Sequence, residues 1–509
     1  MKEGANPMKK RILALLLAAM ILASAVSCGN GNEKETDKAT DSDTTANSTE
    51  TETEETRLTD SLPEDLDFGG ATYTIYARED LEWGTEMYVD ELNGEIVNDA
   101  IYNRSRTVDD RLNVAIGQIT APGIWGNEAS FQEAIRSAVM AGDDTYQLVA
   151  GYAYFITALA TDGVFMNLLD VPYIDFEKPW WNSDLRDELT LYDQLYFACG
   201  DLSMTLLSST FCMFFNKDMA TKYNVPDLYE TVQNGDWTYD NMYSLVQSIA
   251  VDVNGDGKMD AEDEYGLVMP IGNQCDLLFA AFDQPLTAKN ADGSISIRMG
   301  DPKAQDIADK MMDLFTKNDG AFCVTEENNT EQTHYLPFRE GRALLVTASF
   351  NFAEKTLRSL DLSYGIIPFP KYDENQAKYQ TISQDAYSLF CVPLTAGDAA
   401  MIGAVTEALA FDSYENVTPA YFESAMKAKY SQDEASARML DIIRDGLTFN
   451  FGFVNSSSCE NMIHILRNVA SSNKGYASIY AANEPKYTAA LDTLVAKYKE
   501  LGEKLKAAQ

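Results

Sequence analysis

DLDFGGATYTIYA at residues 65–77 and GEIVNDAIYNRSRTVDDRLNV at residues 94–114 are the two stretches that decide the fold. The first contains a Gly-Gly turn and then alternates in side-chain character, which is typical of a β-strand. The second places Ile101, Val108 and Leu112 on one face at helical spacing. A strand that is followed by an amphipathic helix predicts the start of an α/β fold.

The alternation of strands and helices continues along the chain. Residues 113–119 have the pattern of a second strand, residues 130–141 that of a second helix, and YQLVA at residues 146–150 that of a buried strand. Strands that alternate with helices are typical of a parallel sheet. Because 509 residues exceed what one hydrophobic core usually serves, we expect an α/β protein of two lobes.

The chain is strongly acidic, with a formal net charge of −40. A surface of this sign repels nucleic acid phosphates and anionic lipids, so we expect neither as a partner. The charge suits a soluble extracytoplasmic protein whose ligand is neutral or cationic. Acidity that only keeps the protein soluble explains the composition equally well.

Cysteine and histidine usage disfavours metal-dependent and nucleophilic catalysis. Seven cysteines occur, and the six that follow Cys28 are spread singly without a CxxC pair. They are typical of small buried hydrophobic residues rather than of disulfides or metal ligands. The two histidines, His334 and His464, lie far apart in the sequence, which excludes a multi-histidine zinc site and disfavours a His-based triad.

The N-terminal region has the pattern of a secretory signal. Residues 8–28 read MKKRILALLLAAMILASAVSC, a basic start and an apolar run too short to span a bilayer as a helix. Its last residue resembles the lipidated cysteine of the bacterial lipobox, although Ala25 stands where leucine is usual. We predict a lipoprotein signal peptide at residues 1–28 with Cys28 as the lipid anchor; an ordinary cleaved signal is the alternative. Residues 29–60, acidic and without an aromatic residue, predict a disordered tether.

A series of motifs resembles one protein family. FGGATYTIY, GEIVNDAIYNRSRTVDDRLNV and YQLVAGYAYFITALATDGVFMNLLD resemble, in this order, the first lobe of bacterial extracellular solute-binding lipoproteins of family 1, the carbohydrate-type receptors of ABC importers. CMFFNKDMATKYNVPDLYE, WTYDNMYSLVQ, FREGRALLVTAS and YGIIPFPKYDENQAKYQT are similar to later parts of the same family, as is the helical region from EALAFDSYENV onward. The resemblance covers nearly all of residues 62–509. It implies a two-lobed, periplasmic-binding-protein-like (type II) α/β fold with three hinge crossings and the ligand in the cleft.

The resemblance also implies where the chain divides. Each lobe is expected from two separate parts of the chain, namely residues 62–190 plus 388–448 for lobe 1 and residues 191–387 plus 449–509 for lobe 2. The crossings between the lobes are expected near residues 189–197, 379–387 and 448–453. Leucines at helical spacing predict an amphipathic closing helix at residues 487–505.

Residues 252–263, DVNGDGKMDAED, have the spacing of a calcium-binding loop. Gly257 stands where the sharp turn requires glycine. The predicted Ca²⁺ ligands are five side chains and one backbone carbonyl, that of Lys258: Asp252, Asn254, Asp256, Lys258, Asp260 and Asp263. The last ligand is Asp where Glu is usual, which predicts weaker affinity. A strand pattern follows the loop, so we expect a structural rather than a catalytic ion. An acidic turn without an ion is the alternative.

Sugar sites combine aromatic platforms with polar groups, beyond the carboxyl ends of strands in doubly wound sheets. Five candidate ligand-binding residues follow predicted strands: Tyr152, Tyr154, Asn273, Ser349 and Phe350. Three further candidates are Asp385, in the expected second crossing, and the tandem pair Trp180 and Trp181. Tyr152 and Tyr154 directly follow YQLVA, where the resemblance implies an aromatic platform. Trp180 and Trp181 either line the mouth of the cleft or wedge the loop before the first crossing. Trp125 lies in a glycine-containing loop, and the sequence does not decide whether it faces the cleft.

The sequence and the resemblance together predict a receptor rather than an enzyme. We expect a monomer, lipid-anchored to the outer face of the cell membrane, that binds a sugar or oligosaccharide and delivers it to the membrane permease subunits of an ABC transporter. Two alternatives remain open. One is a two-carboxylate glycosidase, for which no local pair of acids stands out. The other is a receptor for a non-sugar solute such as a peptide.

Overall fold

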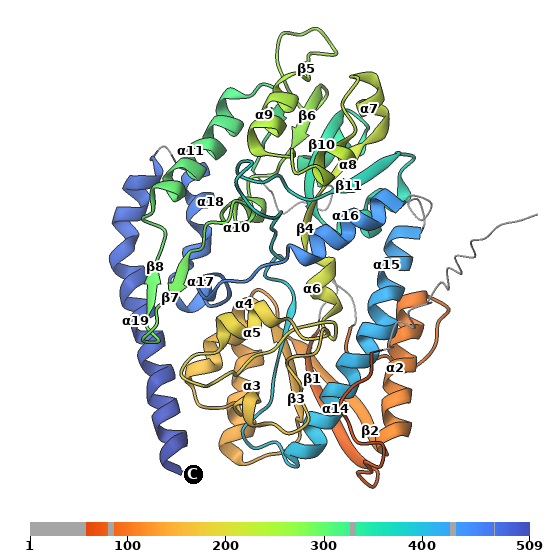
Figure 1. The fold of residues 1–509 in the computed structure, drawn as a ribbon, viewed down its shortest axis with the longest axis vertical. Helices are drawn as coiled ribbons and strands as arrows, with labels where there is room; N and C mark the ends of the chain where they lie inside the picture. The colour runs from red at the N-terminus through yellow and green to blue at the C-terminus, as the bar shows by residue number, and fades with distance from the viewer. Residues whose placement is uncertain (1–57, 80–85, 326–331, 428–433, 473, 509) are drawn as a thin grey trace, which may run out of the picture. The chain divides into compact units, whose positions relative to one another are not determined.

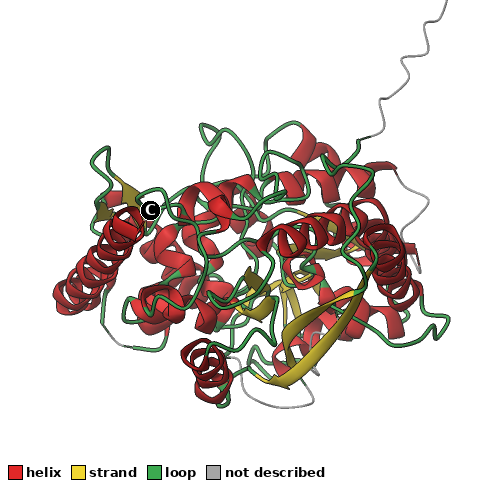
Figure 2. Cartoon of the chain, turned by 90° about the horizontal axis from the view of Figure 1, so that it is seen from below, coloured by secondary structure: helices red, strands yellow, loops and turns green. Residues whose placement is uncertain are grey.

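The computed structural model describes residues 58–79, 86–325, 332–427, 434–472 and 474–508 (Figures 1 and 2). The predicted signal peptide with Cys28, and all but the end of the predicted tether, lie outside the described residues. Thr59–Gln509 forms one compact unit. Among the described helices, none combines the length and the apolar character that crossing a membrane requires.

The first of the two main sheets has four strands in the order β12-β3-β1-β2. Their bounds are Ala71–Glu79 for β1, Val114–Pro122 for β2, Leu148–Tyr152 for β3 and Ser388–Cys391 for β12. β1 runs parallel to β2 and β3, with Ala71 opposite Val114, whereas β12 runs antiparallel to β3. The predicted parallel α/β sheet is confirmed, and a strand from late in the chain is added to it.

Three helices pack with this sheet: α2 (Ile96–Leu112), α3 (Glu128–Ala141) and α14 (Ala399–Asp412). The face that the sequence predicts for α2 is buried, at Ile101, Val108 and Leu112. α2 ends where Asn113 adopts a left-handed conformation with φ of 50°. α14 is apolar along most of its length, and Thr406 on it lies 2.7 Å, Oγ1 to Oη, from Tyr73 of β1.

The second main sheet has the order β11-β4-β10-β6-β5, with β9 paired to β6. The bounds are Phe211–Asn216 for β4, Ala250–Val251 for β5, Glu264–Val268 for β6, Ala321–Phe322 for β9, Ala343–Ser349 for β10 and Tyr364–Ile367 for β11. All residues of FCMFFN in β4 and of ALLVTAS in β10 are buried. Such continuous apolar runs are typical of strands covered on both faces.

The remaining elements fill the space around and between the sheets (Figure 1). The helices from β3 to β11 are α4 (Ala153–Ile156), α5 (Ser183–Leu189), α6 (Met204–Ser208), α7 (Lys217–Lys222), α8 (Leu228–Gln233), α9 (Tyr239–Gln247), α10 (Leu277–Ala281), α11 (Pro302–Lys317), α12 (Leu336–Arg339) and α13 (Asn351–Lys355). A separate hairpin pairs β7 (Thr287–Lys289) with β8 (Ile295–Ile297). After α14 follow α15 (Thr418–Lys427), α16 (Glu434–Asp445), α17 (Phe451–Val454), α18 (Ile465–Ala470) and α19 (Tyr476–Ala508).

Two segments connect the two sheets, and backbone hydrogen bonds join them to each other and to a third segment, the one between α16 and α17. Phe211 N donates to Ile382 O at 3.0 Å, which links the first segment to the second. Thr381 N donates to Gly446 O at 2.9 Å, and Thr448 N donates back to Thr381 O at 2.9 Å, which links the second to the third. The predicted architecture of two α/β halves is therefore present. The third passage between the halves lies between α14 and α16 rather than at residues 448–453, because α14 packs on α2 and α16 packs on β11 and α8.

Two segments belong to the opposite half of the molecule from the one that the resemblance implies. Ala198, expected in lobe 2 after a crossing at residues 189–197, pairs with Phe390 of β12 in the first sheet. The first crossing therefore lies later, just before Phe211. α16, expected in lobe 1, packs on β11 and α8 of the second half. Both segments bury apolar side chains, such as Met439 of α16, and such patterns fit either half equally well.

The predicted closing helix is present and longer than expected, because α19 begins at Tyr476. Its first turns pack on the second half, where Tyr476 donates its hydroxyl to Met299 O at 2.7 Å. Its later turns pack on the first half, where Gln194 Nε2 donates to Tyr498 O at 3.3 Å. α19 therefore contacts both halves, as its course along one side of Figure 1 shows.

Candidate ligand-binding site

A cavity of about 40 Å³ lies among the crossings and the segments that follow β3 and β6. Its lining residues come from both halves of the molecule: Ala153, Tyr154, Phe211, Asn273, Asp276, Ile382, Ser383, Gln384, Asp385, Tyr387, Thr448, Phe449, Phe453, Val454, Ile463 and Arg467. Tyr154, Asn273 and Asp385 are among the residues selected from the sequence. A fourth candidate from the sequence, Tyr152, donates a hydrogen bond to Asp385.

An ion pair between Asp276 and Arg467 forms one wall of the cavity. Arg467 Nε lies 2.9 Å from each carboxylate oxygen of Asp276, and Nη2 also donates to Oδ2. The side chain of Asp276 is 4% exposed, so its charge is withdrawn from water. A guanidinium that binds a carboxylate in this way fixes both groups in direction as well as in distance. Sequence reasoning missed the pair because its members lie 191 positions apart and share no local motif.

Asp385 supplies a carboxylate from the second crossing. Tyr152 donates its hydroxyl to Asp385 Oδ1 at 3.1 Å, and the guanidinium of Arg78 lies 4.7 Å from the centre of the Tyr152 ring. Burial raises the pKa of Asp385 above its usual value, although Arg467, the Tyr152 hydroxyl and Arg78 act to lower it. When ionised, this carboxylate can accept hydrogen bonds from ligand hydroxyl groups.

Aromatic rings surround Tyr154 at the edge of the cavity. The ring of Tyr154 lies 5.2 Å from Trp125, 5.1 Å from Phe155 and 5.9 Å from His464, measured between centroids. Trp125 is 57% exposed, which is high for an indole, although it also contacts Phe155 at 4.7 Å. The structure thus places Trp125 beside the cavity residue Tyr154, a position that the sequence left open. In the sequence, the position of Trp125 is marked by a glycine on either side, Gly123 and Gly126.

His464 is a neutral acceptor or donor near the cavity. Burial and the charge of Arg467 lower the pKa of His464 to about 4. Among the described residues no group donates to its Nε2, and the same holds for Oδ1 of the cavity residue Asn273. Together with the carboxylate of Asp385, these atoms offer the site hydrogen-bond acceptors. The arrangement suits a ligand that is rich in hydroxyl groups.

Trp180 and Trp181 were selected as candidates, but they do not line this cavity. Trp180 Nε1 donates to Glu407 Oε1 at 3.0 Å, and Trp181 Nε1 donates to Oε2 at 2.8 Å. Both side chains are at most 4% exposed. They border a second cavity of about 380 Å³, to which Asp201 and Arg444 also contribute. These contacts agree with the second interpretation of the sequence, in which the two tryptophans wedge the loop before the first crossing.

Ser349 and Phe350 also lie away from the cavity. Ser349 Oγ donates to Asn351 Oδ1 at 2.7 Å, and the side chain of Phe350 is 3% exposed within the core beside β10. Phe350 N donates to Thr210 O in the first crossing. The end of β10 therefore packs against a crossing, whereas the ends of β3 and β6 lead to the cavity.

The predicted calcium loop forms a series of tight turns. Asp252 accepts hydrogen bonds from the N–H groups of Gly255 at 2.6 Å and Gly257 at 2.8 Å. Asp263 accepts from Val253 and Asp260, both at 2.9 Å. Among the described residues no three His, Cys, Asp or Glu side chains are placed to hold a metal ion as they stand. A carboxylate has about four acceptor positions, so these bonds leave some for an ion.

Comparison with known proteins identifies the fold. No protein-family model and no curated protein matches the sequence. The galacto-N-biose-/lacto-N-biose I-binding protein of an ABC transporter from Bifidobacterium longum superposes with a TM-score of 0.56 at 11% identity, covering 84% of this chain and 98% of its own. The cyclic α-maltosyl-1,6-maltose binding protein from Arthrobacter globiformis superposes with a TM-score of 0.56 at 14% identity, covering 84% of this chain and 100% of its own. A family 1 extracellular solute-binding protein from Bifidobacterium longum subsp. infantis superposes with a TM-score of 0.51 at 11% identity, covering 83% of this chain and 100% of its own. The chain has the two-lobed α/β fold of these solute-binding proteins, as the resemblance implied.

Proposed function

We propose that this protein is an extracytoplasmic receptor that binds a sugar or oligosaccharide between its two halves and delivers it to the permease subunits of an ABC transporter. The cavity among the crossings carries the proposal, since aromatic rings and hydrogen-bond acceptors from both halves meet there. Sugars present apolar C–H faces and many hydroxyl groups, which such a site recognises. Structures with this fold include the sugar-binding proteins named above.

The size of the cavity indicates how binding proceeds. A volume of about 40 Å³ holds a few water molecules. Pockets for small-molecule ligands measure roughly 300 Å³ or more. The halves must therefore separate at the crossings to admit a sugar and close again around it. Receptor function then consists of capture and closure, without a bond made or broken.

A panel of oligosaccharides tests the proposal. Calorimetry with the purified protein should show saturable binding of at least one sugar, and an assay for reducing ends should show that the sugar stays intact. Trp125→Ala should weaken that binding about tenfold, because it removes an exposed aromatic face. Trp125→Phe, which keeps an aromatic face, serves as the matched control. Release of new reducing ends would identify a glycosidase, and binding of peptides alone would identify a receptor for another solute.

We further propose that Cys28 carries the lipid that holds the receptor at the membrane. The support is the sequence of residues 8–28 together with the acidic tether that follows. Cys28→Ala should move the protein from the membrane fraction to the medium or the soluble extracytoplasmic fraction. Ser27→Ala, which keeps the cysteine, should stay with the membrane. Equal distribution of the two variants contradicts the anchor.

We also propose that the loop at residues 252–263 binds a structural Ca²⁺. Its support is the spacing of oxygen ligands and the turn at Gly257, whose φ is 81°. At about a hundredfold excess over its dissociation constant, the ion would add about 2.7 kcal/mol to the free energy of unfolding. The melting temperature should therefore rise with calcium and fall with a chelator. Asp252→Asn should abolish this difference, whereas Asp292→Asn, in a similar turn of the β7–β8 hairpin, should keep it. An unchanged melting temperature rules out the site.

A further inference from the structure

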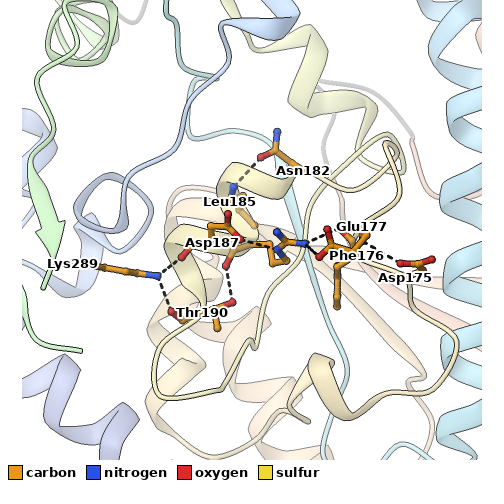
Figure 3. A network of polar contacts seen from close by, with 9 residues as sticks. Asp175, Phe176, Glu177, Asn182, Leu185, Asp187, Thr190 and Lys289 are labelled. Atoms are coloured by element: carbon orange, nitrogen blue, oxygen red, sulfur yellow. Dashed lines mark hydrogen bonds and ion pairs between the residues drawn. The ribbon is translucent and has the colours of Figure 1, made fainter. Parts of the chain in front are cut away.

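The C-terminal end of α5 lies against β7 and the start of α17, as Figure 3 shows for Lys289 and the residues that it meets. Lys289 Nζ, from β7, donates to Thr190 O at 2.7 Å and also to Asp187 O. These carbonyl groups lie at the end of α5, where a helix leaves carbonyl groups without helical partners. A cation is favourable at this position because it meets the negative end of the helix dipole.

A third hydrogen bond joins α5 to the same region. Glu188 Oε2, on α5, accepts a hydrogen bond from Phe451 N at 2.6 Å, at the first residue of α17. α17 in turn is fixed to β7: Thr287 N donates to Asn450 Oδ1 at 3.1 Å, and Asn450 Nδ2 donates to Thr287 O at 2.8 Å. β7 and the start of α17 therefore form one unit that meets α5 through Lys289 and Glu188.

α5 itself belongs to the half of the molecule that holds the first sheet. Trp181, just before α5, pairs with Gly200, and Ala198 pairs with β12. Arg186 on α5 donates to Phe176 O at 3.1 Å, within the network drawn in Figure 3. β7 follows α10, whose neighbour Phe282 packs on Tyr239 of α9 in the other half. The three hydrogen bonds of Lys289 and Glu188 therefore run between the halves.

These bonds lie next to the cavity. Phe451 is flanked in sequence by Phe449 and Phe453, which both line the cavity. Both charged groups are half-buried. Burial raises the pKa of Glu188, although the N–H of Phe451 and the charge of Lys289 act to lower it. Burial lowers the pKa of Lys289, although Glu188 and Asp187 act to raise it. Such groups are stable as charges only while their partners stay in place.

We propose that Glu188 and Lys289 form a clasp between α5 and the β7–α17 unit, which holds the cavity wall at residues 449–454 against the first half and sets how readily the cavity opens. Neither residue touches the ligand in this role; both are positioning residues. The consequence for ligand capture rests on the proposed function, whereas the clasp itself can be tested without any ligand.

The test uses the full chain without ligand, in hydrogen–deuterium exchange and small-angle scattering. Lys289→Met combined with Glu188→Met should raise the exchange rate of residues 449–454 about tenfold over the wild type. The strands β1 and β10 should exchange at their wild-type rates, and the radius of gyration should increase. Glu188→Gln, which keeps an acceptor for Phe451 N–H, should have a smaller effect. Lys303→Met removes a half-buried lysine that donates to Asp283 O within one half, and it should change neither readout.

Two results would overturn the clasp. The first is wild-type exchange at residues 449–454 together with an unchanged radius of gyration in the double variant. The second is an equal rise in exchange in β1, β10 and residues 449–454, which assigns both residues to overall stability alone. If no sugar in the panel binds, the receptor proposal fails while this test keeps its meaning.

Discussion

Replacing Arg467 by methionine is expected to lower the free energy of unfolding by about 3–5 kcal/mol, because the buried carboxylate of Asp276 loses the guanidinium that neutralises it. Urea unfolding of the wild type and the variant measures the difference. The same change should also abolish the binding of any sugar found with the panel, since the pair forms a wall of the cavity. Among single substitutions at this site we expect none larger in effect on stability.

A second variant separates stability from binding. Asp276→Leu together with Arg467→Met removes both charges, and replacement of a buried ion pair by apolar residues is often close to neutral. The double variant should therefore regain most of the stability while binding stays lost. Arg298→Met breaks an exposed pair with Asp301 and should cost about 1 kcal/mol or less. If Arg467→Met costs no more than Arg298→Met, the pair does not stabilise the fold.

The sequence predicted the fold well because the strand and helix patterns are local. The alternation after the Gly-Gly turn marks β1, and the spacing of Ile101, Val108 and Leu112 marks α2. Hydrophobic periodicity depends only on neighbours within a few turns, so one chain suffices to read it. The position of the crossings depends on long-range packing instead. Ala198 and α16 were accordingly assigned to the wrong halves.

The candidate site was predicted only in part, for the same reason. Tyr154, Asn273 and Asp385 follow strands or lie in a crossing, so topology alone brings them to the cavity. Arg467 and His464 come from the short helical segments near the end of the chain, where no pattern marks them. Their role depends on partners far away in the sequence, Asp276 for Arg467 and Tyr154 for His464, which a single sequence does not reveal.

Trp180 and Trp181 have a hydrogen-bond partner that was not identified from the sequence. An indole needs a partner for its N–H group when it is buried. That partner is Glu407, which lies in the apolar sequence AAMIGAVTEALAFD of α14 and is fully buried. A single glutamate inside such a helix is the sequence signal that was overlooked, because a buried carboxylate requires donors nearby.

Glu407 and His464 are expected to give the stability of the protein two opposing pH dependences. Burial raises the pKa of Glu407 to about 7 from 4.5, although the N–H groups of Trp181, Asp175 and Trp180 act to lower it. Between these two values the folded state holds a proton that the unfolded state lacks, so the free energy of unfolding rises as the pH falls from about 7 to about 4.5. The pKa of His464 is lowered to about 4 from 6.5, so its contribution to stability is lost as the pH falls from about 6.5 to about 4.

Each effect is on the order of 3 kcal/mol, and in the wild type the two largely cancel between about pH 4.5 and 6.5. Substitution of one group should expose the other. Relative to the wild type, Glu407→Gln should become less stable as the pH is lowered from about 8 to about 5, whereas His464→Gln should become more stable. Urea unfolding at both pH values measures the two differences. Fluorescence gives an independent readout, since a titration near neutral pH that reaches the indoles of Trp180 and Trp181 should disappear in Glu407→Gln. If the free energy of unfolding of both variants changes with pH as it does in the wild type, the pKa of neither group differs between the folded and unfolded states.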